Sequence, residues 1–160
     1  MQYLWYVLGA LAVAGVSFGV AQNFRSVAGG IVTDGDMTRL VICPATPNCV
    51  SSYGGSGYAR LDPWPYGEVE RSAAHEALVS ILQDEARVTI ERDDENYVHS
   101  VFRSRIFRFR DDVEFYFPDD EPVIHFRAAS RMGQGDLGVH ERRMRALAER
   151  YSSAIESRLD

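Results

Sequence analysis

The feature that most constrains the fold of this chain is the alternation of apolar and charged residues between positions 97 and 138. A β-strand points successive side chains to opposite faces, so alternation with a period of two predicts strands with one buried face. Three consecutive segments share this pattern. Their apolar positions are Val98, Phe102 and Ile106, then Val113, Phe115 and Phe117, then Ile124, Phe126 and Ala128. The pattern predicts an antiparallel sheet whose second face is polar and in contact with solvent.

The second face of the predicted sheet is unusually rich in charge. Its residues are His99, Arg103 and Arg105, then Asp112, Glu114 and Tyr116, then His125 and Arg127. One interpretation is a solvated face on which Arg and carboxylate side chains pair across strands, each pair contributing about 0.2–1 kcal/mol. The other interpretation is that Arg and carboxylate groups are concentrated there to bind a ligand or a partner.

The length and charge of the chain limit its class. With 160 residues it is long enough for one domain with a real core. The net charge of −6 argues against a general nucleic-acid binder, because phosphate binding needs a basic surface. All 17 basic residues are Arg, a side chain suited to planar, bidentate recognition of carboxylates and phosphates.

An uncharged, apolar stretch occupies residues 3–21. About 20 such residues form a helix long enough to cross the hydrocarbon core of a bilayer, and Tyr3, Trp5 and Tyr6 lie where an interfacial aromatic belt would be. The stretch therefore predicts a single-pass transmembrane anchor over 1–24. A cleaved signal peptide is the alternative, but no basic residue precedes the apolar run.

Residues 25–67 lack sustained periodicity and predict a linker followed by an ordered loop. Cys43 and Cys49 lie in this loop, where prolines and Asn48 favour a turn that brings the thiols together. In an oxidising compartment the two cysteines would form a disulfide. Alternatively, Cys49 or Ser51, next to Ser52, is a nucleophile with His99, His125 or His140 as its base. Two cysteines without a nearby Cys/His pair do not complete a zinc site, and we expect no metal or cofactor.

Two amphipathic helices complete the expected fold of region 68–160. Apolar residues recur at helical spacing from Val69 to Leu82 and again from Met144 to Leu159, and Asp136 is placed to stabilise the start of the second helix. The predicted fold is α+β: an N-terminal transmembrane helix, then a four-stranded antiparallel sheet covered on one face by the two helices.

Three separated motifs resemble the bacterial and plastid family known as domain of unknown function fourteen-ninety-nine. The motif residues are Pro47 to Ser52, then Ser104, Arg105, Phe107 to Phe109 and Asp111 to Phe115, then Arg127, Ala129 to Arg131, Gly133 and Asp136 to Gly138. The resemblance covers about residues 40–150. His140 and Glu141 depart from the Asn-Arg of the family pattern.

The resemblance implies no activity, because the family is uncharacterised. It implies a membrane-linked domain that is often outside the cytoplasm, which favours an oxidised Cys43–Cys49 pair. It also supports placing the anchor in a bacterial inner membrane, with the folded domain in the periplasm. The single charge of Arg25 after the apolar stretch favours the opposite orientation, with the domain on the cytoplasmic side.

Three functions follow as hypotheses. The first is a non-enzymatic accessory or assembly subunit that contacts the lipid bilayer and docks on a larger membrane protein complex. The second is a module that binds an anionic small molecule or lipid head group, and the third is an enzyme that uses Cys49 or Ser51 as nucleophile or Asp112 and Glu114 as acid and base. The residues we expect to bind a ligand or partner are Arg105, Asp111, Asp112, Glu114, Arg127, Ser130, Arg131 and Asp136.

Overall fold

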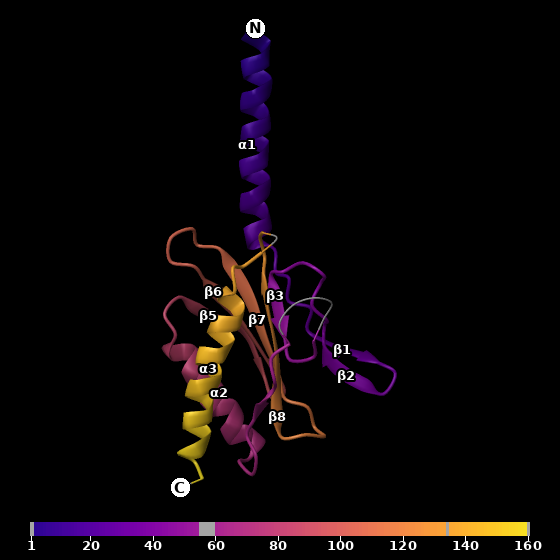
Figure 1. The fold of residues 1–160 in the computed structure, drawn as a ribbon, viewed down its shortest axis with the longest axis vertical. Coiled ribbons are helices and arrows are strands. Elements are labelled where there is room, and N and C mark those ends of the chain that lie inside the picture. Colours follow the sequence, from indigo (N-terminus) through magenta and orange to yellow (C-terminus); the bar gives the residue numbers. More distant parts are fainter. Residues whose placement is uncertain (1, 55–59, 134, 160) are drawn as a thin grey trace.

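The computed structural model describes residues 2–54, 60–133 and 135–159. Its centre is a six-stranded antiparallel sheet (Figure 1). Four strands follow one another as a meander: β5 (Val88–Asp94), β6 (Tyr97–Arg103), β7 (Arg110–Tyr116) and β8 (Val123–Ser130). β3 (Cys49–Ser51) and β4 (Trp64–Pro65) both pair with β8, and the strand order is β3-β8-β7-β6-β5.

The prediction of a four-stranded sheet is therefore wrong. The two additional strands come from residues 25–67, which we expected to be a linker and a loop. Strands of three and two residues are too short to show alternation, so their pairing with β8 leaves no periodic signal in the sequence. The same region also forms a separate two-stranded hairpin, β1 (Ile31–Asp34) and β2 (Met37–Leu40).

Two helices cover one face of the sheet. They are α2 (Arg71–Asp84) and α3 (Val139–Glu156), which lie side by side in front of the strands (Figure 1). Leu78 of α2 and Tyr151 of α3 are fully buried against Phe115 and Phe126 of the sheet. Trp64 packs among the aromatic rings, 5.2 Å from the centroid of Phe126 and 5.6 Å from that of Tyr151. Burial of such side chains is the main favourable term in folding.

The opposite face of the sheet is not the fully solvated face that we predicted. The segment that follows α1 lies against part of it, and residues 26–30 of that segment are hydrogen-bonded to Asp112 and Glu114. Leu40, Tyr97 and Tyr116 form a second small apolar cluster under this cover. Glu114 and Asp112, which we expected on a wet surface, are completely inaccessible to solvent.

α1 (Gln2–Phe24) extends away from the sheet (Figure 1). Crossing a bilayer requires about 20 predominantly apolar residues in one helix. Across the described part of the chain, no helix combines the length and the apolar character that this requires. The finding overturns the predicted transmembrane anchor and the single-pass placement in an inner membrane, to which the periplasmic location of the domain was tied.

The strand predicted through Ile106 ends earlier, at Arg103. Residues 104–109 form the connection between β6 and β7, in which the Ser104 hydroxyl accepts a hydrogen bond from the Phe109 amide at 2.9 Å. Ile106 is 80% exposed and Phe107 72% exposed. The assignment of Ile106 to the buried face of the sheet is therefore wrong.

Candidate functional site

Two consecutive aspartates at the start of β7 point to opposite faces of the sheet. Asp111 faces α3, where it accepts hydrogen bonds from Ser130 and Arg143. Asp112 faces the N-terminal cover, where it contacts His99 and Arg131. The alternation of a strand requires this division, so the two carboxylates belong to separate sites.

Asp112 is the centre of a buried network of hydrogen bonds. Arg131 donates to it through Nε at 2.9 Å and Nη2 at 2.7 Å, and His99 Nε2 lies 2.7 Å away. The Val27 amide and the Ser26 hydroxyl donate from the N-terminal cover at 2.7 and 3.1 Å. Burial alone would raise the pKa of Asp112, but the hydrogen bonds from His99, Arg131 and Val27 outweigh it and hold that pKa far below its usual range. Asp112 is therefore an anion at neutral pH and has no proton to give as a general acid.

Glu114 forms the second part of this network. Arg127 donates to one of its oxygens at 2.8 Å, and the Tyr97 hydroxyl and the Gly30 amide donate to the other at 2.8 and 2.7 Å. Arg127 also donates to the Val27 carbonyl at 3.1 Å. Breaking a buried pair of this kind typically costs about 3–5 kcal/mol. The network thus fastens residues 26–30 to the sheet, and both Asp112 and Glu114 are occupied by structural contacts.

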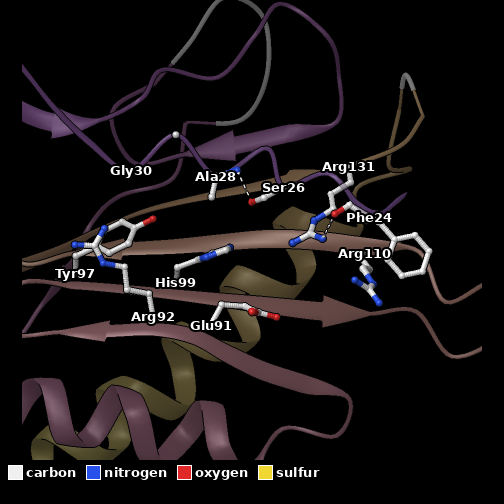
Figure 2. A pocket seen from close by; sticks show the side chains of 11 residues that line it. Phe24, Ser26, Ala28, Gly30, Glu91, Arg92, Tyr97, His99, Arg110 and Arg131 are labelled. Atoms are coloured by element: carbon white, nitrogen blue, oxygen red, sulfur yellow. Dashed lines mark hydrogen bonds between the residues drawn. The ribbon is translucent and has the colours of Figure 1, made fainter. Parts of the chain in front are cut away.

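An open cleft of about 600 Å³ remains between residues 24–30 and strands β5 and β6. Figure 2 shows Tyr97 and Arg92 at one end of the cleft, His99 near its middle, and Arg110 beside Phe24 at the other end. The guanidinium of Arg110 lies over the Phe24 ring, 4.2 Å from its centroid. Arg131, which also lines the cleft, is held by Asp112 and by the Phe24 carbonyl.

Arg110, at this end of the cleft, has a second arginine opposite it on the neighbouring strand. Arg110 is the direct cross-strand partner of Arg103, so both side chains leave the sheet on the same face. Among the described residues, neither side chain forms an ion pair with a carboxylate, in contrast to Arg92 and Arg131. Nε of Arg103 is buried and has no hydrogen-bond partner in the part of the chain that the structure describes. Like charges directly opposite one another destabilise a sheet.

The structure places the predicted site residues in three groups. Asp112, Glu114, Arg127 and Arg131 meet in the buried network described above. Asp111, Ser130 and Asp136 lie on the other side of β7 near the start of α3, where Asp136 accepts the amide hydrogens of Gly138 at 3.0 Å and His140 at 2.8 Å. Arg105 is exposed in the connection between β6 and β7 and joins neither group.

The cysteine loop is closed by the predicted disulfide. Cys43 and Cys49 are bonded, with their Cα atoms 5.7 Å apart. Asn48 of this loop donates to the Gly133 carbonyl at 2.9 Å, so the loop supports the turn before α3. Cys49 carries no free thiol in this state and cannot act as a nucleophile.

Ser51 and Ser52 also have structural partners. The Ser51 hydroxyl accepts the Tyr53 amide at 3.2 Å. Ser52 lies 2.9 Å from His125 Nδ1, and His125 Nε2 lies 2.7 Å from Glu121, an arrangement that resembles a hydrolase triad. The Ser52 hydroxyl is 2% exposed and already accepts the Phe126 amide at 3.0 Å, so these contacts anchor β3 to β8 rather than present a nucleophile to solvent.

Sequence reasoning left Arg110 out of the candidate site. Arg110 precedes Asp112 by two positions and Glu114 by four in the same strand. Alternation alone could therefore have placed its side chain on the same face of the sheet as theirs. The contacts from Ser26, Val27 and Gly30 had no comparable signal, because they join segments more than 80 residues apart, mainly through backbone atoms.

These features define an α+β domain in which a disulfide loop supports the start of α3 and an N-terminal cover is fastened over a buried ion network. The chain belongs to the family described as "Protein of unknown function (DUF1499)", whose model matches residues 39–150. No curated protein and no solved structure matches the chain.

Proposed function

We propose that this protein is a binding module that holds a small anion, a phosphate or a carboxylate, at the Arg110 end of the cleft. The observation that carries the proposal is the Arg103–Arg110 pair, two opposed cations without a carboxylate partner among the described residues. Guanidinium groups present paired N–H donors that match the oxygens of phosphates and carboxylates. An anion between the two Arg side chains would remove their repulsion and give the buried Nε of Arg103 an acceptor.

The other groups of the cleft favour binding over catalysis. Asp112 is ionised and fully hydrogen-bonded, and Glu114 is closed off beneath Gly30. His99 is turned toward Asp112, and its Nε2 is occupied by that contact. The proposed role is therefore recognition of an anionic ligand without chemical change.

Thermal unfolding in matched buffers tests the proposal. At equal ionic strength, sodium phosphate should raise the Tm of the full chain relative to sodium chloride. A ligand at ten times its Kd stabilises by about 1.4 kcal/mol, or roughly 3–6 °C for a domain of this size. Sodium succinate in a parallel series distinguishes carboxylate from phosphate recognition.

Two variants make the test specific. Arg110→Gln should abolish the anion-dependent part of the shift. Arg145→Gln, which removes an exposed cation paired with Glu141 on α3, should leave it unchanged. An equal shift in wild type and Arg110→Gln would contradict the proposal, as would the absence of a shift in wild type with both anions.

A second candidate function is an accessory subunit that docks on a larger protein complex. It is favoured by the exposed connection between β6 and β7, where Ile106 and Phe107 are 80% and 72% exposed between Arg105 and Arg108. Aromatic and Arg side chains are enriched at protein interfaces. A photo-crosslinking residue at position 107 should capture one stoichiometric partner, whereas the same residue at position 37, on the β1–β2 hairpin, should not.

A further inference from the structure

A second cavity lies on the opposite side of β7 from the cleft, at the start of α3. It has a volume of about 300 Å³. One wall is apolar and includes Phe109, Leu137 and Val139, and the floor is formed by Asp111, Ser130, His140 and Arg143. We call this cavity the Asp111 pocket.

The apolar wall of the Asp111 pocket faces water. Phe109 is 44% exposed, Val139 40% and Leu137 93%. A single exposed apolar side chain needs no explanation, but several that line one cavity mark a surface that another molecule covers.

Leu137 adds an independent observation. Its φ of 52° lies in the left-handed region, which a bulky side chain rarely adopts. Because the side chain is almost fully exposed, packing within the chain does not account for a leucine at this position. Asn or Gly would adopt the same backbone at lower cost. Unfavourable backbone conformations of this kind are typical of ligand sites.

The polar part of the Asp111 pocket holds two carboxylates, Asp111 and Asp136, and one guanidinium, Arg143. Arg143 donates to Asp111 at 2.8 Å, and Ser130 donates to the other carboxylate oxygen at 2.9 Å. His140, 3.0 Å from the Ser130 hydroxyl, is neutral at physiological pH, because burial lowers its pKa. Each carboxylate oxygen has two acceptor positions and each accepts one of these bonds, so Asp111 can accept a further hydrogen bond at either oxygen.

We propose that the Asp111 pocket binds an uncharged apolar molecule that carries one hydroxyl group. The apolar body lies against Phe109, Leu137 and Val139, and the hydroxyl donates to Asp111. The two carboxylates of the lining outnumber its one guanidinium and disfavour an anionic head group, and the Asp136 carboxylate already accepts the amides of Gly138 and His140. The site is separate from the anion cleft and independent of the function proposed for it.

A residue-resolved NMR titration of the full chain tests this inference. The probe is 1-naphthol, which has an aromatic body and one hydroxyl, and 1-methoxynaphthalene is the matched analogue without a donor. The amide resonances of residues 135–139 should shift saturably with 1-naphthol, and 1-methoxynaphthalene should bind several-fold more weakly. Leu137→Asn removes part of the apolar wall while keeping a residue suited to the left-handed backbone. It should weaken binding about five- to ten-fold.

The control variant is Met37→Asn, which removes an exposed apolar side chain from the β1–β2 hairpin and should leave the affinity for 1-naphthol unchanged. Shifts confined to other parts of the chain, or equal affinity in wild type and Leu137→Asn, would overturn the site. Equal binding of 1-methoxynaphthalene would overturn the role of the hydroxyl.

Discussion

Arg103 and Arg110 face one another across β6 and β7, and neither forms an ion pair with a carboxylate among the described residues. A sheet normally places opposite charges at such positions, because like charges directly opposed are destabilising. Arg110 lines the open cleft and lies beside the end of α1, where the Asn23 side-chain oxygen accepts the Arg110 amide at 2.9 Å. Repulsion between the two guanidinium groups destabilises the protein when no ligand is bound, and a bound anion would remove this repulsion.

Replacing Arg103 by Gln should therefore stabilise the protein when no anion is bound. We expect the free energy of unfolding to rise by about 0.3–1 kcal/mol at low ionic strength, because the repulsion from Arg110 is gone. The gain should shrink as sodium chloride is added, since salt screens the repulsion in wild type. Urea unfolding at low and high salt measures it. A loss of stability at low salt would show that Arg103 has a favourable role that this account omits.

Replacing Asp112 by Asn should strongly destabilise the fold. The change leaves Arg131 and His99 without their buried anion, a loss of about 3–5 kcal/mol for a buried pair. Asp119→Asn is the matched control, because it removes an exposed partner of Arg71 and should cost at most about 1 kcal/mol. Similar losses in the two variants by chemical denaturation would contradict the role assigned to the network.

The acid limb of the stability curve should also depend on Asp112. The pKa of Asp112 is lowered in the folded state. Its ionised carboxylate therefore contributes fully to the free energy of unfolding above the pKa of Asp in the unfolded chain, about 3.9. This contribution is lost progressively as pH falls from there through the pKa of the folded state. Wild type should lose this contribution below about pH 4, whereas Asp112→Asn, already destabilised, should show a shallower decline. Urea unfolding at intervals from pH 7 to pH 3 measures both slopes, and identical slopes would count against the lowered pKa.

His140 should make stability depend on pH in a higher range. Burial lowers its pKa in the folded protein, so the unfolded chain binds more protons below about pH 6.5 and the free energy of unfolding falls as pH decreases from there. His140→Gln removes this proton uptake, and its stability should vary less between pH 7 and pH 5 than that of wild type. Met37→Asn, an exposed position on the β1–β2 hairpin, introduces no titratable group and is the control; it should keep the wild-type dependence in this range.

Removing the disulfide should loosen the turn before α3. Cys43 and Cys49 are six positions apart, and closing so short a loop contributes about 2 kcal/mol. The double variant Cys43→Ala, Cys49→Ala should lose about this much stability. The Asp136 amide, which donates to the Pro47 carbonyl at 3.2 Å, should exchange its hydrogen faster. A reducing agent should reproduce both effects in wild type and have none in the variant.

The sequence predicted which side chains share a face more reliably than it predicted the extent of the sheet. Alternation placed Asp112, Glu114 and Arg127 on one face, and the structure brings Glu114 and Arg127 into direct contact. It also placed the apolar residues of β7 and β8 under the two helices. These relationships follow from local periodicity, which each strand carries in its own sequence.

Three features had no local signal. β3 pairs with β8 through only three residues, so no alternation marks it as a strand. The cover over the polar face is held by the amides of Val27 and Gly30, which any residue type supplies. Ile106 fits the period-two apolar pattern of the preceding strand. The strand nevertheless ends before Ile106, because the chain turns between Ser104 and Phe109, which are joined by a hydrogen bond.

The most direct test of the anion site is to observe the Nε–Hε resonances of Arg103 and Arg110 by ¹⁵N NMR while the full chain is titrated with pyrophosphate. We predict that both resonances shift saturably with the same Kd, and that the resonance of Arg145, on α3, stays unperturbed. A titration in which Arg103 and Arg110 do not respond, or respond no more than Arg145, would contradict the proposed site.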